Sequence, residues 1–276
     1  MTKVLNYHVK QKNNLIFVSK SFALKITFLG TGTSQGIPVI GSTHPVCLSS
    51  NFKDKRLRVS VLIQWDNYTY VIDCGPDFRQ QMLRADCTKM DGILFTHEHA
   101  DHTAGLDDIR PFFFKQGDIP IYAHKRVIKE LKRRFDYIFE TENKYPGAPN
   151  VLINKIKNKP FLLHNMKVVP IKGLHYNLQV FGFRFDRFAY LTDMKTIEDK
   201  EVDKMKGLDV LVVNALRKEP HVSHFTLDEA LAFIKKVNPK KAYLTHISHL
   251  LGFHDEVQQQ LPENVFLAYD NLQITI

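Results

Sequence analysis

Short runs of β-branched and aromatic residues recur along the chain, and turn residues separate them. Valine, isoleucine, tyrosine and phenylalanine dominate these runs, as is typical of strands that pack on at least one face. The pattern predicts strands at residues 25–30, 59–65, 68–74, 92–96, 119–123, 167–171, 188–193, 209–216, 241–246 and 265–270.

Helical patterns lie between the predicted strands, at residues 77–85, 126–139 and 226–237. The last pattern begins with Thr226 and has Glu229 three residues later, which is the signature of a capping box. Strands that alternate with helices favour an α/β fold.

The order of these segments shows no clean linker, so we expect one domain at residues 25–276 and an N-terminal extension at residues 1–24. Residues 140–160 are polar and contain three prolines and a glycine. They predict a loop insertion over one face of the domain.

Composition narrows the class of protein. The chain has 276 residues, 44% of them hydrophobic and 24% charged, which is ordinary for a globular protein. No apolar run is long enough for a transmembrane helix, and the N-terminus lacks the features of a signal peptide. Three cysteines without a CxxC motif make a disulfide framework unexpected, so we expect a cytoplasmic protein that does not bind membranes.

A net charge of +9 favours anionic partners. The surplus is concentrated in residues 124–160, which hold ten lysines and arginines against four acidic residues. Two interpretations stay open: a solvated helix face followed by a loop, or an electrostatic funnel beside an anion site.

The segment FTHEHADH, residues 95–102, concentrates groups that can bind metal ions. It follows a predicted strand, where α/β sheets expose ligand sites. Positions i and i+2 of an extended segment project to the same side, so His97 and His99 can reach one ion. Asp101 and His102 come a turn later and can reach a second ion. Imidazole and carboxylate ligands suit zinc, and also manganese or iron.

Three further residues end apolar runs in the same way: His175, Asp193 and His246. Asp193 has two carboxylate oxygens, so it can bridge two metal ions. Together with the FTHEHADH residues they make seven candidate ligands, which is enough for a two-metal site.

These motifs resemble the metallo-β-lactamase superfamily of hydrolases. The resemblance rests on HxHxDH at 97–102, on the three distant ligands, and on the segments FLGTGTSQGIPV (28–39) and VIDCGPDFRQQ (71–81). It implies an αββα sandwich, in which two mixed sheets pack together with helices outside. It also implies that His97, His99 and His175 hold one ion, that Asp101, His102 and His246 hold the other, and that Asp193 bridges them.

Two divalent ions, most simply zinc, would activate a shared water, so a hydroxide between them is the expected nucleophile. Asp101 is then both a ligand and a catalytic residue. Asp73 has two open interpretations: it orients a ligand histidine, or it is a turn aspartate.

His224 stands just before the predicted helix at 226–237. Phosphodiesterase branches of the superfamily carry a histidine at this place, which acts as a general acid and contacts phosphate. The resemblance therefore implies this catalytic role for His224, against the alternative of an ordinary residue next to a helix cap. His221 is interpreted as a residue of the surface or as one that supports a neighbouring site residue.

The segments GTGTSQGIPVIG and THISHLLGFH resemble the branch that contains the cyclic phosphodiesterase of carbon–phosphorus lyase pathways. That branch implies a small anionic substrate with a cyclic phosphodiester. Its members carry a structural zinc on a CxCxxC motif and a later histidine. Here only His44, Cys47 and His249 remain for such a site, so it is either retained with an additional ligand or lost.

Several alternatives stay open. A tRNA 3′-processing endonuclease shares the metal ligands and would bind RNA through the basic stretch. Other members of the superfamily hydrolyse thioesters or lactams, and a metal-binding protein without catalysis is a further alternative. Homodimers are common in such families.

Overall fold

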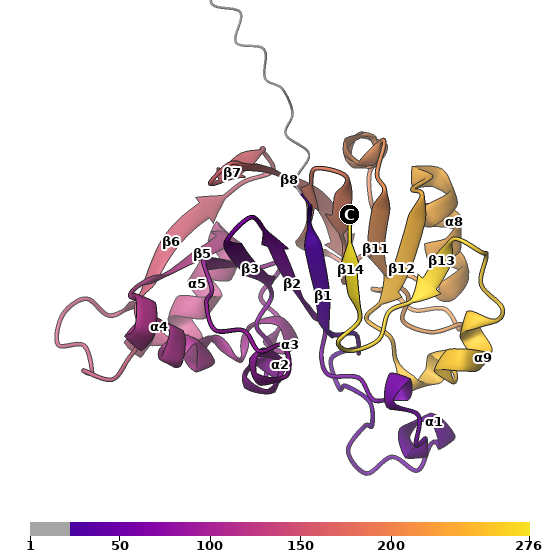
Figure 1. Cartoon of the computed structure of the whole chain (residues 1–276), viewed down its shortest axis with the longest axis horizontal. Helices are drawn as coiled ribbons and strands as arrows, with labels where there is room; N and C mark the ends of the chain where they lie inside the picture. Colours follow the sequence, from indigo (N-terminus) through magenta and orange to yellow (C-terminus); the bar gives the residue numbers. More distant parts are fainter. Residues whose placement is uncertain (1–22) are drawn as a thin grey trace, which may run out of the picture.

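The computed structural model describes residues 23–276, and almost all of the predicted extension at 1–24 lies outside them. The chain forms two sheets of seven strands each (Figure 1). In spatial order, the first sheet contains β14 (Gln273–Thr275), β1 (Lys25–Gly30), β2 (Ser60–Trp65), β3 (Tyr68–Ile72), β4 (Gly92–Leu94), β5 (Ile119–His124) and β6 (Val151–Ile156). The second contains β13 (Val265–Leu267), β12 (Lys241–Thr245), β11 (Val210–Asn214), β10 (Phe188–Tyr190), β9 (Leu178–Phe185), β8 (Met166–His175) and β7 (Phe161–Leu163).

Each sheet is mixed. In the first, β14, β1, β2 and β3 pair antiparallel, and β3 to β6 pair in parallel. In the second, β7 to β10 are antiparallel, and β10 to β13 are parallel. The parallel halves matter most for function, because the carboxyl ends of parallel strands meet at one edge.

The two sheets pack face to face through a core rich in aromatic side chains. Phe28 and Trp65 from the first sheet and Phe183 and Phe185 from the second are all at most 1% exposed. Trp65 also stacks on Tyr70, with ring centroids 5.2 Å apart. Burial of each such side chain stabilises the fold by about 1.5–3 kcal/mol, so this shared core holds the sheets in fixed register.

Helices cover the outer face of each sheet. A second core lies between the first sheet and α2 (Phe78–Arg84), α4 (Arg110–Gln116) and α5 (Lys125–Arg134). A third lies between the second sheet and α8 (Leu227–Val237) and α9 (His254–Gln258), which Figure 1 shows beside β12 and β13. The short helices are α1 (Pro45–Leu48), α3 (Ala100–Thr103), α6 (Asp136–Phe139) and α7 (Asp199–Val202). These four layers confirm the predicted αββα sandwich.

Some predictions of local structure are confirmed and others are wrong. The capping box of α8 is present, with Thr226 and Glu229 bonded reciprocally. The predicted loop at 140–160 is wrong in its second half, because β6 occupies Val151–Ile156 and pairs with β5. β6 lies at the sheet edge, and its four apolar residues stand within a segment that polar residues and prolines dominate. β9 was missed although it is apolar, because Gly182 interrupts its pattern; a Cβ there would lie 2.7 Å from the Tyr190 carbonyl.

The two ends of the described chain lie side by side. β14, the last strand, pairs with β1, the first, and both contribute to the core between the sheets. We therefore propose that residues 25–276 form a single domain. Within residues 23–276 no helix is both long and apolar enough to cross a lipid bilayer.

Candidate metal centre

The candidate ligands lie where strands of both sheets end. His97 follows β4, and His175 is the last residue of β8. Asp193 follows β10, and His246 follows β12 directly. The packing of the two sheets brings these strand ends together, although the residues lie up to 149 positions apart in the sequence.

Three of the strand-end residues have a left-handed backbone. The φ angles are 62° at Asp73, 55° at Asp193 and 56° at His246. Left-handed conformations are uncommon outside glycine, and each costs free energy that the surrounding structure must offset. Here the chain turns sharply after each strand, and all three side chains are buried.

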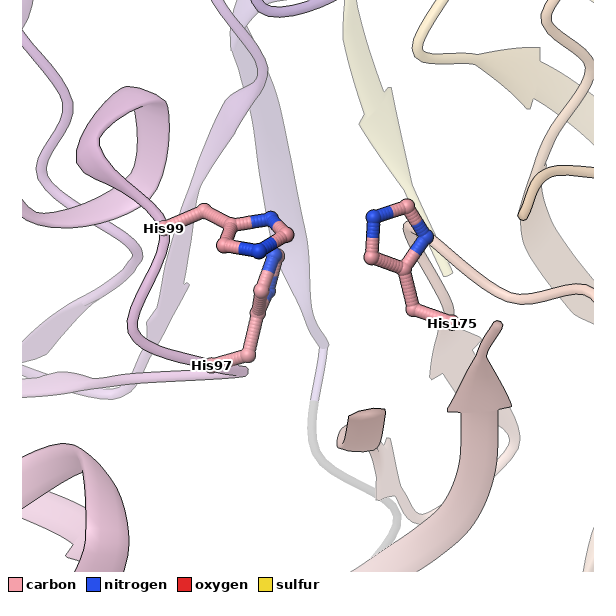
Figure 2. Close-up of side chains that lie close together, drawn as sticks. All are labelled: His97, His99 and His175. Carbon is pink, nitrogen blue, oxygen red and sulfur yellow. The ribbon is translucent and has the colours of Figure 1, made fainter. Parts of the chain in front are cut away.

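The first group consists of His97, His99 and His175. Their ligand atoms all lie within 4.8 Å of one another. Figure 2 shows the three rings facing a common point, two from the loop after β4 and one from the end of β8. The ring centroids of His97 and His99 are 4.6 Å apart, and those of His99 and His175 are 5.1 Å apart. One ion can therefore contact all three imidazoles.

The second group consists of Asp101, His102, Asp193 and His246, again with ligand atoms within 4.8 Å. Asp193 lies between the two rings: Oδ2 is 3.1 Å from Nε2 of His102, and Oδ1 is 3.1 Å from Nε2 of His246. Asp193 also belongs to a third group, with His175. It thus has neighbours in both predicted ion sites, as a bridging ligand requires, and the assignment of each ligand to one ion stays a prediction.

Hydrogen bonds orient the rings from behind. His102 Nδ1 lies 2.7 Å from Asp73 Oδ2, and His97 Nδ1 lies 3.0 Å from Thr96 Oγ1. His175 Nδ1 donates to the Ser223 carbonyl at 2.8 Å. In all three rings the Nδ1 atom is held, which turns Nε2 toward the centre. Asp73 is fully buried and contacts His102 directly, and its role in orienting that ring stays a prediction.

The donor atoms fit divalent metal ions. The Nε2 atoms of His97, His102 and His246 are buried, and none has a hydrogen-bond partner within residues 23–276. Two of them, those of His102 and His246, lie 3.1 Å from Asp193 oxygens but outside hydrogen-bond geometry. Three buried nitrogens without a hydrogen bond would be costly in a protein without a ligand. Imidazole nitrogens with carboxylate oxygens form a donor set that suits zinc, manganese or iron.

The charges of the cluster stabilise the carboxylates. Burial alone would raise the pKa of Asp193, but His246 and His102 lower it overall to well below its usual range. Burial would also raise the pKa of Asp101, but His102 and His246 lower it overall to below its usual range. Burial lowers the pKa of His97, whereas the carboxylates raise that of His102 in spite of burial.

His224 lies at the same centre. Its ring centroid is 4.5 Å from that of His175 and 4.7 Å from that of His246. Its Nδ1 is 3.7 Å from Asp193 Oδ1 and has no hydrogen-bond partner within the described residues. Burial, together with His246, lowers the pKa of His224 to about 2. The ring centroid of His221 lies 5.0 Å from that of His224, so of its two interpretations the supporting one is favoured by this contact.

The structure does not bring the third predicted site together in the same way. The rings of His44 and His249 lie 4.9 Å apart between centroids. Cys47 Sγ instead accepts a hydrogen bond from the Val39 amide at 3.5 Å. In residues 23–276, these three do not form a group with all ligand atoms within 4.8 Å. A structural metal on these residues stays a prediction.

Several residues of the site escaped the sequence analysis. Thr96 contacts the ring of its direct neighbour His97, and its place before the ligand motif was the only local signal. Ser223 contacts His175 from 48 positions away in the sequence, so nothing in the local sequence identifies it. Arg126 Nε lies 2.6 Å from Glu98 Oε1, which connects α5 to the loop that carries His97 and His99. In the sequence, only the position of Glu98 between the two candidate ligands His97 and His99 indicated that Glu98 belongs to the site.

Comparisons with known proteins agree with this geometry. The model of the beta-lactamase superfamily domain matches residues 68–247, more than half of the chain. A crystal structure of a diphosphatase from the PhnP family is 40% identical, with a TM-score of 0.85, and the match covers 91% of this chain and 97% of that one.

Two curated relatives match over part of their length. An octanoyltransferase of Porphyromonas gingivalis is 36% identical over 256 residues, which are 92% of this chain and 52% of the relative. A ribonuclease Z of Methanococcus maripaludis is 25% identical over 157 residues, 55% of this chain and 46% of the relative. The matches thus span about half the length of each relative.

The family assignment rests on three observations: the four-layer fold, the two groups of ligands at the strand ends, and matches over most of the chain. The chain belongs to the metallo-β-lactamase superfamily of hydrolases, and within it to the PhnP family.

Proposed function

We propose that this chain is a two-metal phosphodiesterase that hydrolyses a small, most simply cyclic, phosphodiester. The observation that carries the proposal is the place of His224. Its ring lies beside His175 and His246, one from each predicted ion site, and immediately before α8. A substrate phosphate held at the centre would therefore meet both the ion sites and this ring.

Two divalent ions, when bound, would polarise the phosphate and lower the pKa of an attacking water. The chain's own residues do the rest. The seven predicted ligands would hold the ions, and Asp73, Thr96 and Ser223 contact the Nδ1 atoms of three of the rings. His224 donates a hydrogen bond to a phosphate oxygen, which its neutral ring can do without prior protonation. The substrate's negative charge then raises the pKa of the ring, so that the ring takes up a proton from solvent water and the resulting imidazolium passes this proton to the leaving oxygen.

The similar proteins support chemistry at phosphorus. The 40%-identical structure is a diphosphatase, and the curated relative from Methanococcus maripaludis is a ribonuclease. The octanoyltransferase points to acyl chemistry instead, but this chain covers only 52% of it. We propose that the transfer activity of that protein resides in the part that this chain does not match.

A second candidate function, RNA 3′ processing, is favoured by one surface. A groove of about 680 Å³ between α5 and β6 is lined by two isoleucines and by Lys125, Lys129, Lys132 and Lys155. Within residues 23–276 these lysines make no ion pair with a carboxylate. A polyanion would find complementary charge there, and its affinity would fall steeply with salt.

The deciding experiment combines metal analysis with a panel of substrates: cyclic ribose phosphates, cyclic nucleotides, pre-tRNA and an acyl thioester. We expect about two divalent ions per chain and hydrolysis of a small phosphodiester. Cleavage of pre-tRNA with steep salt dependence would favour the second function. Hydrolysis of the thioester alone would reject both.

The variant His224→Ala tests the catalytic role. We expect its metal content to stay unchanged while phosphodiester hydrolysis falls about 10²–10⁴-fold. His164→Ala is the matched control, because that histidine is exposed and stacks on Tyr68, with ring centroids 3.8 Å apart, outside the metal centre. Full activity of His224→Ala at full metal content would remove His224 from the mechanism.

A cytoplasmic location is part of the proposal. It is supported by Cys47, Cys74 and Cys87, which are all free thiols rather than disulfides, as expected in a reducing compartment.

A further inference from the structure

A cavity opens beside the metal centre, on the side of the first ligand group. Its volume is about 480 Å³, within the range of small-molecule sites. The lining consists of His99, His175, Tyr176, Asn177, Leu178, Val222 and Ser223. Two of these are predicted metal ligands, so a molecule in the cavity would lie next to the reacting phosphate.

Two large apolar side chains of this cavity are left in solvent. Tyr176 is 64% exposed and Val222 is 73% exposed. They come from different segments: Tyr176 follows β8, and Val222 belongs to the loop before α8. Exposed apolar groups around a polar catalytic centre are typical of binding surfaces. Nothing in the packing of the fold requires either side chain.

The backbone conformation at Tyr176 is unfavourable for a tyrosine, so the presence of this residue type there calls for a reason. His175 pairs with Leu178, so Tyr176 and Asn177 form a two-residue hairpin turn. The φ angle of Tyr176 is 55°, a conformation that glycine or asparagine adopts at lower free energy. Its ring is exposed, so packing does not offset this cost. Strain at an exposed residue next to a metal ligand indicates a functional side chain.

We propose that Tyr176 and Val222 form a clamp for an aromatic base, so that the preferred substrate is a phosphodiester that carries a nucleoside. This inference rests on the proposed phosphodiesterase function and names its substrate class. The tyrosine ring supplies a flat face for stacking, which favours a nucleobase over a bare sugar phosphate. The branched side chain of Val222 adds an apolar surface to the lining of the same cavity.

Polar groups in the same lining fit the edge of a base. The carboxamide of Asn177 offers both a donor and an acceptor, and the exposed side chain is free to turn toward a ligand. Ser223 adds a hydroxyl, whose Oγ lies 3.3 Å from His221 Nδ1. A bare sugar phosphate would leave the apolar walls in contact with water.

A matched pair of substrates tests the clamp in the metal-loaded protein. One is adenosine 2′,3′-cyclic phosphate; the other is the methyl riboside 2′,3′-cyclic phosphate, with a methoxyl group in place of the base. We expect the lower KM for the adenosine compound. Tyr176→Ala should raise that KM between about 5-fold and about 100-fold, the range for stacking of one base, with kcat almost unchanged.

Control variants separate the clamp from a structural role. Tyr176→Phe should keep the preference, because the ring remains. Tyr176→Gly should lose it while Tm stays or rises, because glycine relieves the left-handed backbone. A lower Tm for Tyr176→Gly, or an equal rise in KM for both substrates in Tyr176→Ala, would overturn the proposal. So would equal KM values for the two substrates in the unmodified protein.

Binding measurements distinguish failure of the clamp from failure of the phosphodiesterase proposal. Calorimetric titration should give tighter binding of AMP than of ribose 5-phosphate, with the difference abolished in Tyr176→Ala. If neither cyclic phosphate is hydrolysed but AMP is preferred, the phosphodiesterase function fails and the base site stands. If both are hydrolysed but AMP and ribose 5-phosphate bind equally, the base site fails alone.

Discussion

Asp73→Asn is the change that best separates the orientation of a ligand from ligation itself. Asp73 is fully buried and accepts three hydrogen bonds: from the Thr96 amide at 2.8 Å, from Thr96 Oγ1 at 2.7 Å and from His102 Nδ1 at 2.7 Å. Asparagine keeps one oxygen for the amide, but its NH₂ group would face two other donors. The shape of the side chain is preserved, so the perturbation is almost purely electrostatic.

Two consequences follow, with different magnitudes. Loss of a group that orients a ligand histidine weakens metal affinity by about 10–100-fold, or about 1.4–2.7 kcal/mol. Each buried donor left without an acceptor destabilises the fold by about 1–3 kcal/mol. We therefore expect both weaker metal binding and a lower free energy of unfolding for the metal-free protein. Asp73 does not itself belong to the groups of potential ligands.

The assay is a metal titration against a competing chelator, with urea unfolding of the metal-free protein measured in parallel. Asp91→Asn serves as the control, because Asp91 accepts from the Thr69 amide at 2.8 Å and lies just before β4, at the opposite end from His97. The control should keep full metal affinity. Unchanged metal affinity in Asp73→Asn would refute the orienting role, whatever the effect on stability.

Three further predictions concern separate features. Asp193→Ala should lose one or both metals in elemental analysis, and a fully metallated variant would contradict the bridging role. Burial and Arg56 lower the pKa of His254 to about 4 from 6.5, so its contribution to stability is present above pH 6.5 and is lost as the pH falls toward 4. His254→Gln should therefore flatten the decline of the urea midpoint between pH 6.5 and 4, and an unchanged decline would disprove this. Thr226→Ala should lower the free energy of unfolding by about 1 kcal/mol, because the capping box is lost. Urea unfolding measures this change, and Asp228→Ala, at an exposed position of the same helix, is the control that should have a smaller effect.

Elements of the structure that a few neighbouring residues encode could be predicted from the sequence. Buried strands such as β1 and β12 carry continuous apolar runs, and the cap of α8 is encoded by two residues. Edge strands were harder. β6 was predicted as part of a loop because polar residues and prolines dominate the segment around it, and its structure comes from pairing with β5. Pairing partners are distant in sequence, so periodicity does not report them.

The sequence by itself determined which residues can bind metal and on which strand ends they stand. His97 to His102 form a dense motif, and His175, Asp193 and His246 each close an apolar run. The types of these residues do not depend on the fold, but the distances between their side chains do.

Only the tertiary structure decided that these strand ends, drawn from two sheets, meet within a few ångströms. It also decided that Asp73 reaches His102, that Ser223 reaches His175, and that Tyr176 borders the cavity. The physical reason is that such contacts depend on how the shared aromatic core sets one sheet against the other. Packing of that kind is a property of the whole chain, and no segment encodes it alone.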